Sequence, residues 1–317
     1  MSRIVYLTWP TGEITGGIKL IFQHVALLTE AGLPAVVASE DAVAPSWFDT
    51  SATVISTSDV GNQDVLVFPE NHAKLLGNEQ FRPNKKVVYC QNQFMAYRGL
   101  GSCQDYREHG VCGMLALGRL AADFCRHRFP SLPVISVPAA ISDQFGFQST
   151  KTLQIAFAPR KRDFEAAFIH DLFSFRNPRW RDVRWLMIDG QDESVVAQVL
   201  KRSAIYLSLQ RYESVGISAL EAMACGCVVA GFTGQGGREY ASGANGFWAE
   251  EDDVVECTKQ LERGVNCVTS RDSMRVEEVL EAANRTAKYY STDRLGKRII
   301  PFWRSFLEVG DWPPIDA

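Results

Sequence analysis

The sequence predicts an α/β protein of two domains, each built on a parallel, doubly wound sheet. Short apolar runs of strand length alternate with segments of helical spacing, which is the pattern of successive β-α-β units. This alternation starts at the N-terminus and starts again near residue 150. A chain of 317 residues also exceeds the size of one usual hydrophobic core, so two domains are expected.

The first half of the chain contains six apolar runs of strand length. They predict strands at 3–8, 35–38, 65–68, 86–90, 113–117 and 134–137, with a helix over 17–31 after the first strand. Polar neighbours and Gly146 mark 141–151 as the linker to the second domain.

The second half repeats the alternation. Strands are expected at 153–158, 185–188, 204–207 and 228–231, and helices at 163–175, 214–224 and 252–263. Residues 292–307 have helical spacing of apolar side chains, and Pro301 is expected to bend that helix.

Composition narrows the class of protein. The hydrophobic share of 46% and charged share of 22% are those of an ordinary globular protein. A net charge of -4 argues against nucleic acid as the main partner. No apolar run is long enough to span a bilayer, and the first residues lack the pattern of a signal peptide. We therefore expect a cytoplasmic protein whose eight cysteines are reduced.

The most informative segment is 212–230, which follows the strand predicted at 204–207. Ligands of open α/β sheets bind just past the carboxyl ends of strands, and a helix start, expected here near Ser214, favours phosphate. Gly216 allows close approach of the backbone to a ligand, and Glu213 and Glu221 can accept hydrogen bonds from sugar hydroxyls. Taken alone, two glutamates at this spacing are more often a helix cap and a solvated side chain than a binding pair.

Two further clusters are candidates for phosphate contacts. Arg160, Lys161 and Arg162 follow the strand 153–158, where three cations suit a diphosphate but also fit a solvated charge cluster. Gly16 and Gly17 open the first helix, where their backbone could approach a phosphate or form a simple turn.

The segment 213–226 resembles the donor-binding motif of retaining family-4 glycosyltransferases of the GT-B fold. The family pattern is Glu, seven residues, Glu, then Ala-Met-Ala-x-Gly, and this chain carries it at Glu213, Glu221, 222–224 and Gly226. The resemblance implies two Rossmann-like doubly wound domains facing a central cleft. It implies an acceptor-binding domain at 1–148, a nucleotide-sugar-binding domain at 149–291, and a last helix in 292–317 that crosses back to the first domain.

The resemblance also assigns roles. Glu213 would hold the hexose hydroxyls of the donor and Glu221 its ribose, while Arg160 and Lys161 join Glu213 as catalytic residues. The remaining donor-binding residues would be Gly16, Gly17, Arg162, Ser214, Val215, Gly216 and Ile217, with the amides of 215–217 on the diphosphate.

The implied reaction is retaining and metal-independent transfer of a sugar from a nucleoside diphosphate, without any cofactor, in synthesis of a cell-surface glycan or glycolipid. The acceptor would be a glycan, a lipid-linked sugar or a small hydroxyl compound. Alternatives on this architecture are a silent nucleotide-sugar-binding protein, an epimerase, or a phosphorylase with lysine-bound pyridoxal phosphate.

Acceptor contacts are predicted from weaker signals. Gln91 follows the strand 86–90, and His109 lies in a polar segment, so both are candidates. Residues 74–128 hold nine Lys or Arg against four Asp or Glu, which suits an anionic acceptor or peripheral contact with a membrane, or an ordinary mixed surface. The acidic run 250–253 opens a predicted helix and is interpreted as structural, not as a metal site.

Overall fold

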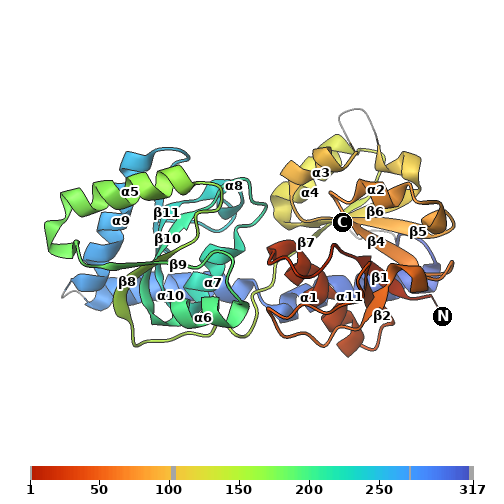
Figure 1. Cartoon of the computed structure of the whole chain (residues 1–317), viewed down its shortest axis with the longest axis horizontal. Helices are drawn as coiled ribbons and strands as arrows, with labels where there is room; N and C mark the ends of the chain where they lie inside the picture. The colour runs from red at the N-terminus through yellow and green to blue at the C-terminus, as the bar shows by residue number, and fades with distance from the viewer. Residues whose placement is uncertain (1, 101–104, 271–272, 314–317) are drawn as a thin grey trace. The chain divides into compact units, whose positions relative to one another are not determined.

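The computed structural model describes residues 2–100, 105–270 and 273–313. The chain forms two compact units (Figure 1). Unit 1 contains 1–140 and 292–317, and unit 2 contains 141–291. The first boundary therefore falls before the predicted 148/149, and the C-terminal segment 292–317 groups with the N-terminal half of the chain.

Unit 1 is a seven-stranded parallel sheet of order β3-β2-β1-β4-β5-β6-β7. Its strands are β1 (Ile4–Leu7), β2 (Ala35–Ser39), β3 (Val54–Ser56), β4 (Val65–Pro69), β5 (Lys85–Cys90), β6 (Val111–Leu117) and β7 (Val134–Val137). Its helices are α1 (Gly16–Glu30), α2 (Ala73–Leu76), α3 (Gln93–Leu100), α4 (Gly118–Arg128) and α11 (Thr292–Val309), with short 3₁₀ turns at Thr57–Asp59, Glu79–Phe81 and Tyr106–His109.

Helices cover both faces of this sheet, as Figure 1 shows: α1 and α11 pack together on one face, and α3 and α4 on the other. This explains why β1 and β4 are apolar without alternation and wholly buried. Helix α1 begins where the Thr15 side chain accepts a hydrogen bond from the amide of Ile18 at 3.4 Å.

Buried polar contacts attach the last helix to unit 1. The Trp303 indole of α11 donates to the Tyr6 hydroxyl of β1 at 3.1 Å, and that hydroxyl also lies 3.1 Å from His24 Nδ1 of α1. Burial lowers the pKa of His24 to about 3, so its ring is neutral. Helix α11 is thus fixed to the interior strand β1 of the first sheet.

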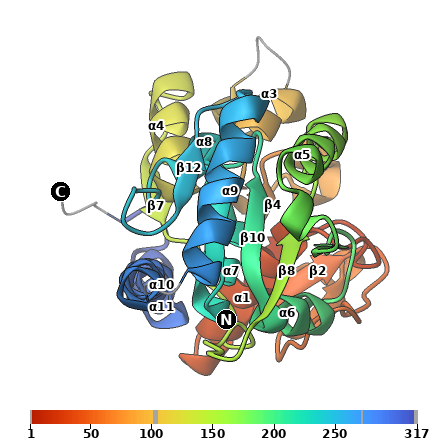
Figure 2. The same ribbon diagram turned by 90° about the vertical axis from the view of Figure 1, so that its left-hand side faces the viewer.

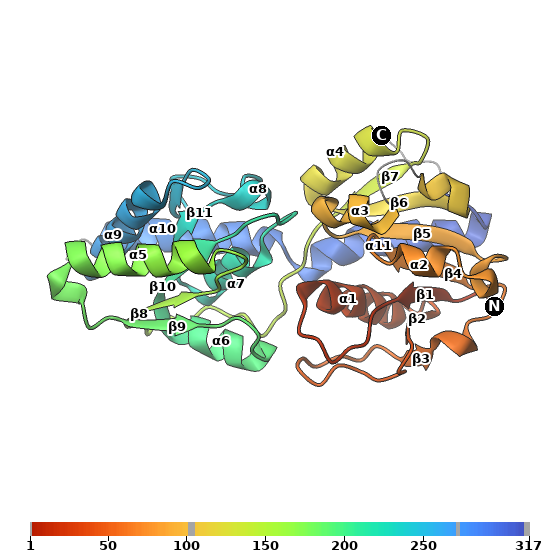
Figure 3. The ribbon, with the colours of Figure 1, turned by 45° about the horizontal axis from the view of Figure 1, so that its top comes forward.

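Unit 2 is a five-stranded parallel sheet of order β12-β11-β10-β8-β9. Its strands are β8 (Thr152–Phe157), β9 (Arg184–Met187), β10 (Ser203–Leu209), β11 (Val228–Phe232) and β12 (Phe247–Ala249). Its helices are α5 (Asp163–Arg176), α6 (Glu193–Arg202), α7 (Ile217–Cys225), α8 (Gly234–Gly237), α9 (Val254–Thr269) and α10 (Ser273–Tyr289), with a 3₁₀ turn at Pro178–Trp180. Figures 2 and 3 show α5 and α9 on one face, with α6, α7 and α10 on the other.

The predicted strands agree with those found to within a few residues, but one helix start was wrong. Helix α7 begins at Ile217, not near Ser214, because Gly216 has a left-handed backbone with φ 75° that no helix continues. Glu221 therefore lies in the second turn of α7, closer to the helix start than predicted.

Two other expectations concern the cysteines and the absence of membrane-spanning segments. All seven cysteines among the described residues are free, as predicted, and Cys103 lies outside those residues. Across the described ranges, every helix is too short or too polar to cross a membrane.

Candidate active site

The carboxyl edge of the unit 2 sheet gathers the residues predicted to bind a donor. Strands β8, β10 and β11 are neighbours and run parallel, so the segments that follow them meet at one edge. These segments are 158–162 after β8, 210–216 after β10 and 233–237 after β11.

A tight turn after β8 presents the first two cations. The amide of Arg162 donates to the carbonyl of Pro159 at 2.9 Å, and Arg160 and Lys161 have φ of 48° and 71°, the signature of a type I′ turn. Such backbone is uncommon for residues with side chains and is frequent at functional sites. The turn directs Arg160 toward α7, where its Nη2 donates to Ser218 Oγ at 2.9 Å.

Glu213 lies within the electrostatic reach of both cations of this turn. Burial raises the pKa of the half-buried Glu213, while the positive charges of Arg160 and Lys161 oppose that rise. Conversely, burial lowers the pKa of Arg160, but nearby carboxylates, with Glu213 first, outweigh it and hold that pKa above its ordinary value. The three residues predicted to be catalytic are therefore brought together.

The backbone between Glu213 and α7 is rigidly held. Gln210 Nε2 donates to the Gly216 carbonyl at 3.0 Å, and the Tyr240 hydroxyl donates to the same carbonyl at 2.8 Å. A Cβ on Gly216 would lie 1.7 Å from Gln210 Oε1, so only glycine fits this position. On the other side, Gly236 of α8 packs so closely that its Cβ would lie 2.5 Å from the Val215 nitrogen.

These contacts explain why glycines are needed in 233–237. They let α8 pack against the backbone of Ser214 and Val215. The start of α7 carries no side-chain cap and no acid in its first turn, so its amides, Ile217 onward, retain the positive end of the helix dipole. Glu221 is half-buried in the second turn of α7.

Arg162 was wrongly predicted to contact the donor. Its side chain is fully buried and forms ion pairs with Glu165 at 3.3 Å, with Asp252 at 2.6 Å and with Glu251. Its guanidinium also lies 4.3 Å from the centre of the Phe232 ring. These ion pairs compensate the charge of Arg162 inside unit 2. Arg160 and Lys161 are therefore the two cations that the turn after β8 offers to a ligand.

The acidic run 250–253 is structural, as predicted, although its partner was not foreseen. Asp253 accepts from the amide of Glu256 at 2.8 Å and caps α9, while Glu251 and Asp252 compensate the buried Arg162. The acids therefore join the loop before α9 to the turn after β8.

A second group of predicted residues meets at the carboxyl edge of the unit 1 sheet. Gln91, directly after β5, is buried and donates to the Gly17 carbonyl at 3.1 Å. A Cβ on Gly17 would lie 2.5 Å from Gln91 Oε1, whereas one on Gly16 would meet open space. The glycine pair and Gln91, predicted separately, thus form one surface.

Glu70 belongs to this surface and was missed. It follows β4, and its two carboxyl oxygens accept the amides of Gln91 and Asn92, each at 3.0 Å. Burial raises the pKa of Glu70 to about 7 despite these hydrogen bonds. A carboxylate directly after the buried run 65–69 was a readable signal, because it stands at a carboxyl strand end.

His109 is not part of this surface. It directly precedes Gly110 and β6, whereas Gln91 follows β5, and these strands pair in parallel with Lys86 opposite Val111 and Cys90 opposite Ala116. His109 therefore lies at the amino edge of the sheet, opposite to Gln91. The prediction for His109 was wrong because β5 and β6 are parallel: a residue that follows β5 and one that precedes β6 lie at opposite edges of the sheet.

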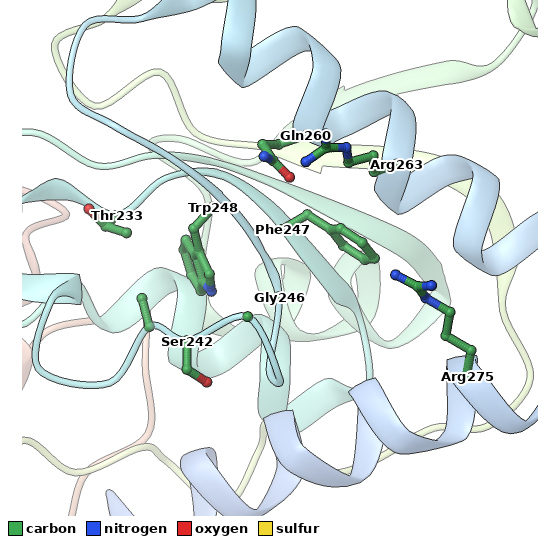
Figure 4. A pocket seen from close by; sticks show the side chains of 10 residues that line it. Thr233, Ser242, Gly246, Phe247, Trp248, Gln260, Arg263 and Arg275 are labelled. Carbon is green, nitrogen blue, oxygen red and sulfur yellow. The ribbon is translucent and has the colours of Figure 1, made fainter.

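A separate cavity of about 530 Å³ lies in unit 2 beside the edge strand β12 (Figure 4). Arg263 of α9 and Arg275 of α10 lie on either side of the Phe247 ring, near Trp248. Neither Glu213 nor Glu221 lines this cavity, so it is distinct from the surface described above.

Comparison with known proteins finds a family model that is similar to part of the chain. Residues 183–280 match the family described as Glycosyl transferases group 1. An alpha-1,6-glucosyltransferase of Actinobacillus pleuropneumoniae is 27% identical over 245 residues, which are 73% of this chain and 72% of that protein.

Solved structures match the fold. HepE of Anabaena, crystallised with UDP and glucose, has a TM-score of 0.70 at 13% identity, over 96% of this chain and all of HepE. A TarM mutant of S. aureus, crystallised with UDP, has a TM-score of 0.59 at 12% identity over 76% of this chain. The chain spans only 55% of the length of that TarM.

Proposed function

We propose that this chain, a glycosyltransferase of the GT-B fold, binds a nucleoside-diphosphate sugar at the carboxyl edge of the unit 2 sheet and transfers the sugar to a hydroxyl acceptor. The observation that carries the proposal is the juxtaposition of the Arg160–Lys161 turn, Glu213 and the uncapped start of α7. Two cations and a helix dipole suit a diphosphate, and a carboxylate beside them suits sugar hydroxyls.

In the proposed reaction the bond between the anomeric carbon and the diphosphate oxygen breaks, and the acceptor oxygen bonds to the same face of that carbon. The acceptor proton passes to the departing diphosphate, so configuration is retained without a protein nucleophile. Arg160, Lys161 and the first amides of α7 stabilise the charge that develops on the diphosphate. Glu213 orients the hexose and Glu221 the ribose.

The same charges support transfer without a metal or a cofactor. Arg160 and Lys161 supply fixed positive charge where a divalent ion would otherwise act. We take a UDP-hexose as the first donor to test, because the HepE and TarM structures hold UDP and the curated relative is a glucosyltransferase.

The acceptor half of the proposal rests on unit 1. Gly17, Gln91 and the buried Glu70 form a polar surface at the carboxyl edge of its sheet, suited to the hydroxyls of a glycan. Synthesis of a cell-surface glycan by a cytoplasmic enzyme is part of this proposal.

The test is release of nucleoside diphosphate from UDP-glucose, UDP-N-acetylglucosamine and GDP-mannose, with and without glycan acceptors and with EDTA present. Transfer should persist in EDTA and vanish in Glu213→Ala and Arg160→Ala, each with the wild-type melting temperature. Arg202→Ala, which removes an exposed cation at the amino edge of the sheet, is the matched control. Full activity in both site variants would refute the assignment, and donor binding without turnover would indicate a silent binding protein.

A further inference from the structure

A cavity of about 440 Å³ opens at the amino edge of the unit 1 sheet. Its lining includes Lys85 and Lys86, which begin β5, and His109 and Gly110, which precede β6. Because Gln91 follows β5 at the opposite edge, this cavity is separate from the proposed acceptor surface. Its lining residues belong to the basic stretch 74–128, and they have no role in the proposed transfer reaction.

Lys86 is the unusual residue of this cavity. Only 3% of its surface is exposed, and its ammonium donates to the Asn84 carbonyl at 3.3 Å. Within 2–100, 105–270 and 273–313, no carboxylate forms an ion pair with Lys86. Burial of an ammonium without a counter-charge is costly, and burial lowers the pKa of Lys86 accordingly.

The ammonium of Lys86 is held beside the cavity by its neighbours. Gly110 has φ 77°, and a Cβ there would lie 3.7 Å from Lys86 Nζ, so this lining residue abuts the charge. The pairing of β5 with β6 shifts register between Lys86 and Val87, an irregularity that redirects side chains. Asn84, also in the lining, has a buried Oδ1 without a hydrogen-bond partner.

The remaining lining carries both signs of charge. Arg82 and Lys85 are its cations, and Glu79 and Glu108 are its acids. The Lys85 ammonium donates to the Gly310 carbonyl. Glu79 is exposed and pairs with Arg82 at 3.4 Å, so it does not reach Lys86. The cavity therefore combines a buried, uncompensated cation with a rim of mixed charge.

We propose that this cavity is a second ligand site that binds a phosphate monoester. The phosphate oxygens would accept hydrogen bonds from the Lys86 ammonium and from Arg82 and Lys85 at the rim. The volume suits a small ligand such as a hexose phosphate, and the phosphate headgroup of a lipid has the same chemistry. Binding of either would compensate the buried charge of Lys86.

Isothermal titration calorimetry of the full chain with inorganic phosphate and with glucose 6-phosphate tests the proposal, together with flotation on phosphatidic acid vesicles. We expect binding that Lys86→Met weakens at least tenfold. The same variant should melt no lower than wild type without ligand, because methionine retains the apolar stem and removes the uncompensated charge. Arg119→Met, an exposed cation of α4 outside the cavity, should bind like wild type.

The outcomes separate the two sources of phosphate. Binding of the soluble phosphates identifies a metabolite site, and binding of vesicles alone identifies a lipid headgroup site. The variant Arg82→Gln removes an exposed rim cation without touching the core and should weaken binding several-fold. Absence of binding to all three probes, or equal binding by Lys86→Met, would overturn the proposal. Donor turnover is measured in parallel and should be unchanged in Lys86→Met.

Discussion

Arg160 donates a hydrogen bond of 2.9 Å to Ser218, which joins the turn after β8 to the first turn of α7. The guanidinium that this bond holds also interacts electrostatically with Glu213. Ser218 is itself buried and comes from a different strand-to-helix unit. The donor half of the site is therefore assembled from two strand-to-helix units whose strands, β8 and β10, are neighbours in one sheet.

Ser218→Ala should weaken donor use without unfolding the protein. Loss of one hydrogen bond to a charged group corresponds to about 1.5 kcal/mol, or about tenfold in kcat/KM for the donor. Steady-state kinetics and a melting curve measure the two effects. Ser174→Ala, which removes a hydroxyl bonded within α5, is the control, and an equal loss there would contradict the assignment.

Gly216→Ala should destabilise unit 2. The left-handed φ of 75° costs about 1–2 kcal/mol for alanine, and the collision with Gln210 adds to it. Chemical denaturation should show the loss, and Gln210→Ala in the same chain should recover part of it. Gly243→Ala, where a Cβ would meet open space, should be neutral.

Arg162→Met and Arg160→Met should give opposite phenotypes although the residues are nearly adjacent. Removal of Arg162 leaves Glu165, Glu251 and Asp252 without their common cation and should lower the free energy of unfolding by about 3 kcal/mol. Arg160→Met should leave stability near wild type and abolish transfer. Equal loss of stability in both variants would show that Arg160 is structural as well.

Glu70 should make stability depend on pH. Its pKa rises from 4.5 to about 7 on folding, so between these values the folded protein keeps a proton that the unfolded chain releases. The stabilising contribution of Glu70 to the free energy of unfolding is therefore fully present below pH 4.5. It is lost as the pH rises to about 7, by about 3 kcal/mol in all.

The measurement for Glu70 is the melting temperature from pH 4.5 to 8 in wild type and in Glu70→Gln. The melting temperature of the variant should change less across this window. It should also be lower at low pH, because the NH2 group that replaces one carboxyl oxygen cannot accept a hydrogen bond, so the backbone amide of either Gln91 or Asn92 loses its acceptor. Glu13→Gln, on an exposed loop, should follow the wild-type curve. If the melting temperature of Glu70→Gln falls with pH as steeply as that of the wild type, the prediction is wrong.

The sequence alone predicted most strands and the fold, because buried parallel strands read as short apolar runs whatever lies beside them. It missed β3, β12 and helices such as α6 and α10, which are short or amphipathic elements at the edges and outer faces of the sheets. It placed α7 too early, because the Gly216 backbone that starts the helix late is held by two tertiary contacts, from Gln210 directly after β10 and from Tyr240 after α8.

By itself, the sequence determined that the chain has two doubly wound halves and that Glu213 and Glu221 stand at a carboxyl strand end. Those properties follow from local pattern and order along the chain. Only the tertiary structure decided that Arg162 is a buried ion-pair partner while Arg160 faces Ser218, because a tight turn sends neighbouring side chains in different directions. It also decided that His109 and Gln91 lie at opposite edges, since the polarity of a parallel sheet, not distance in sequence, determines which residues meet.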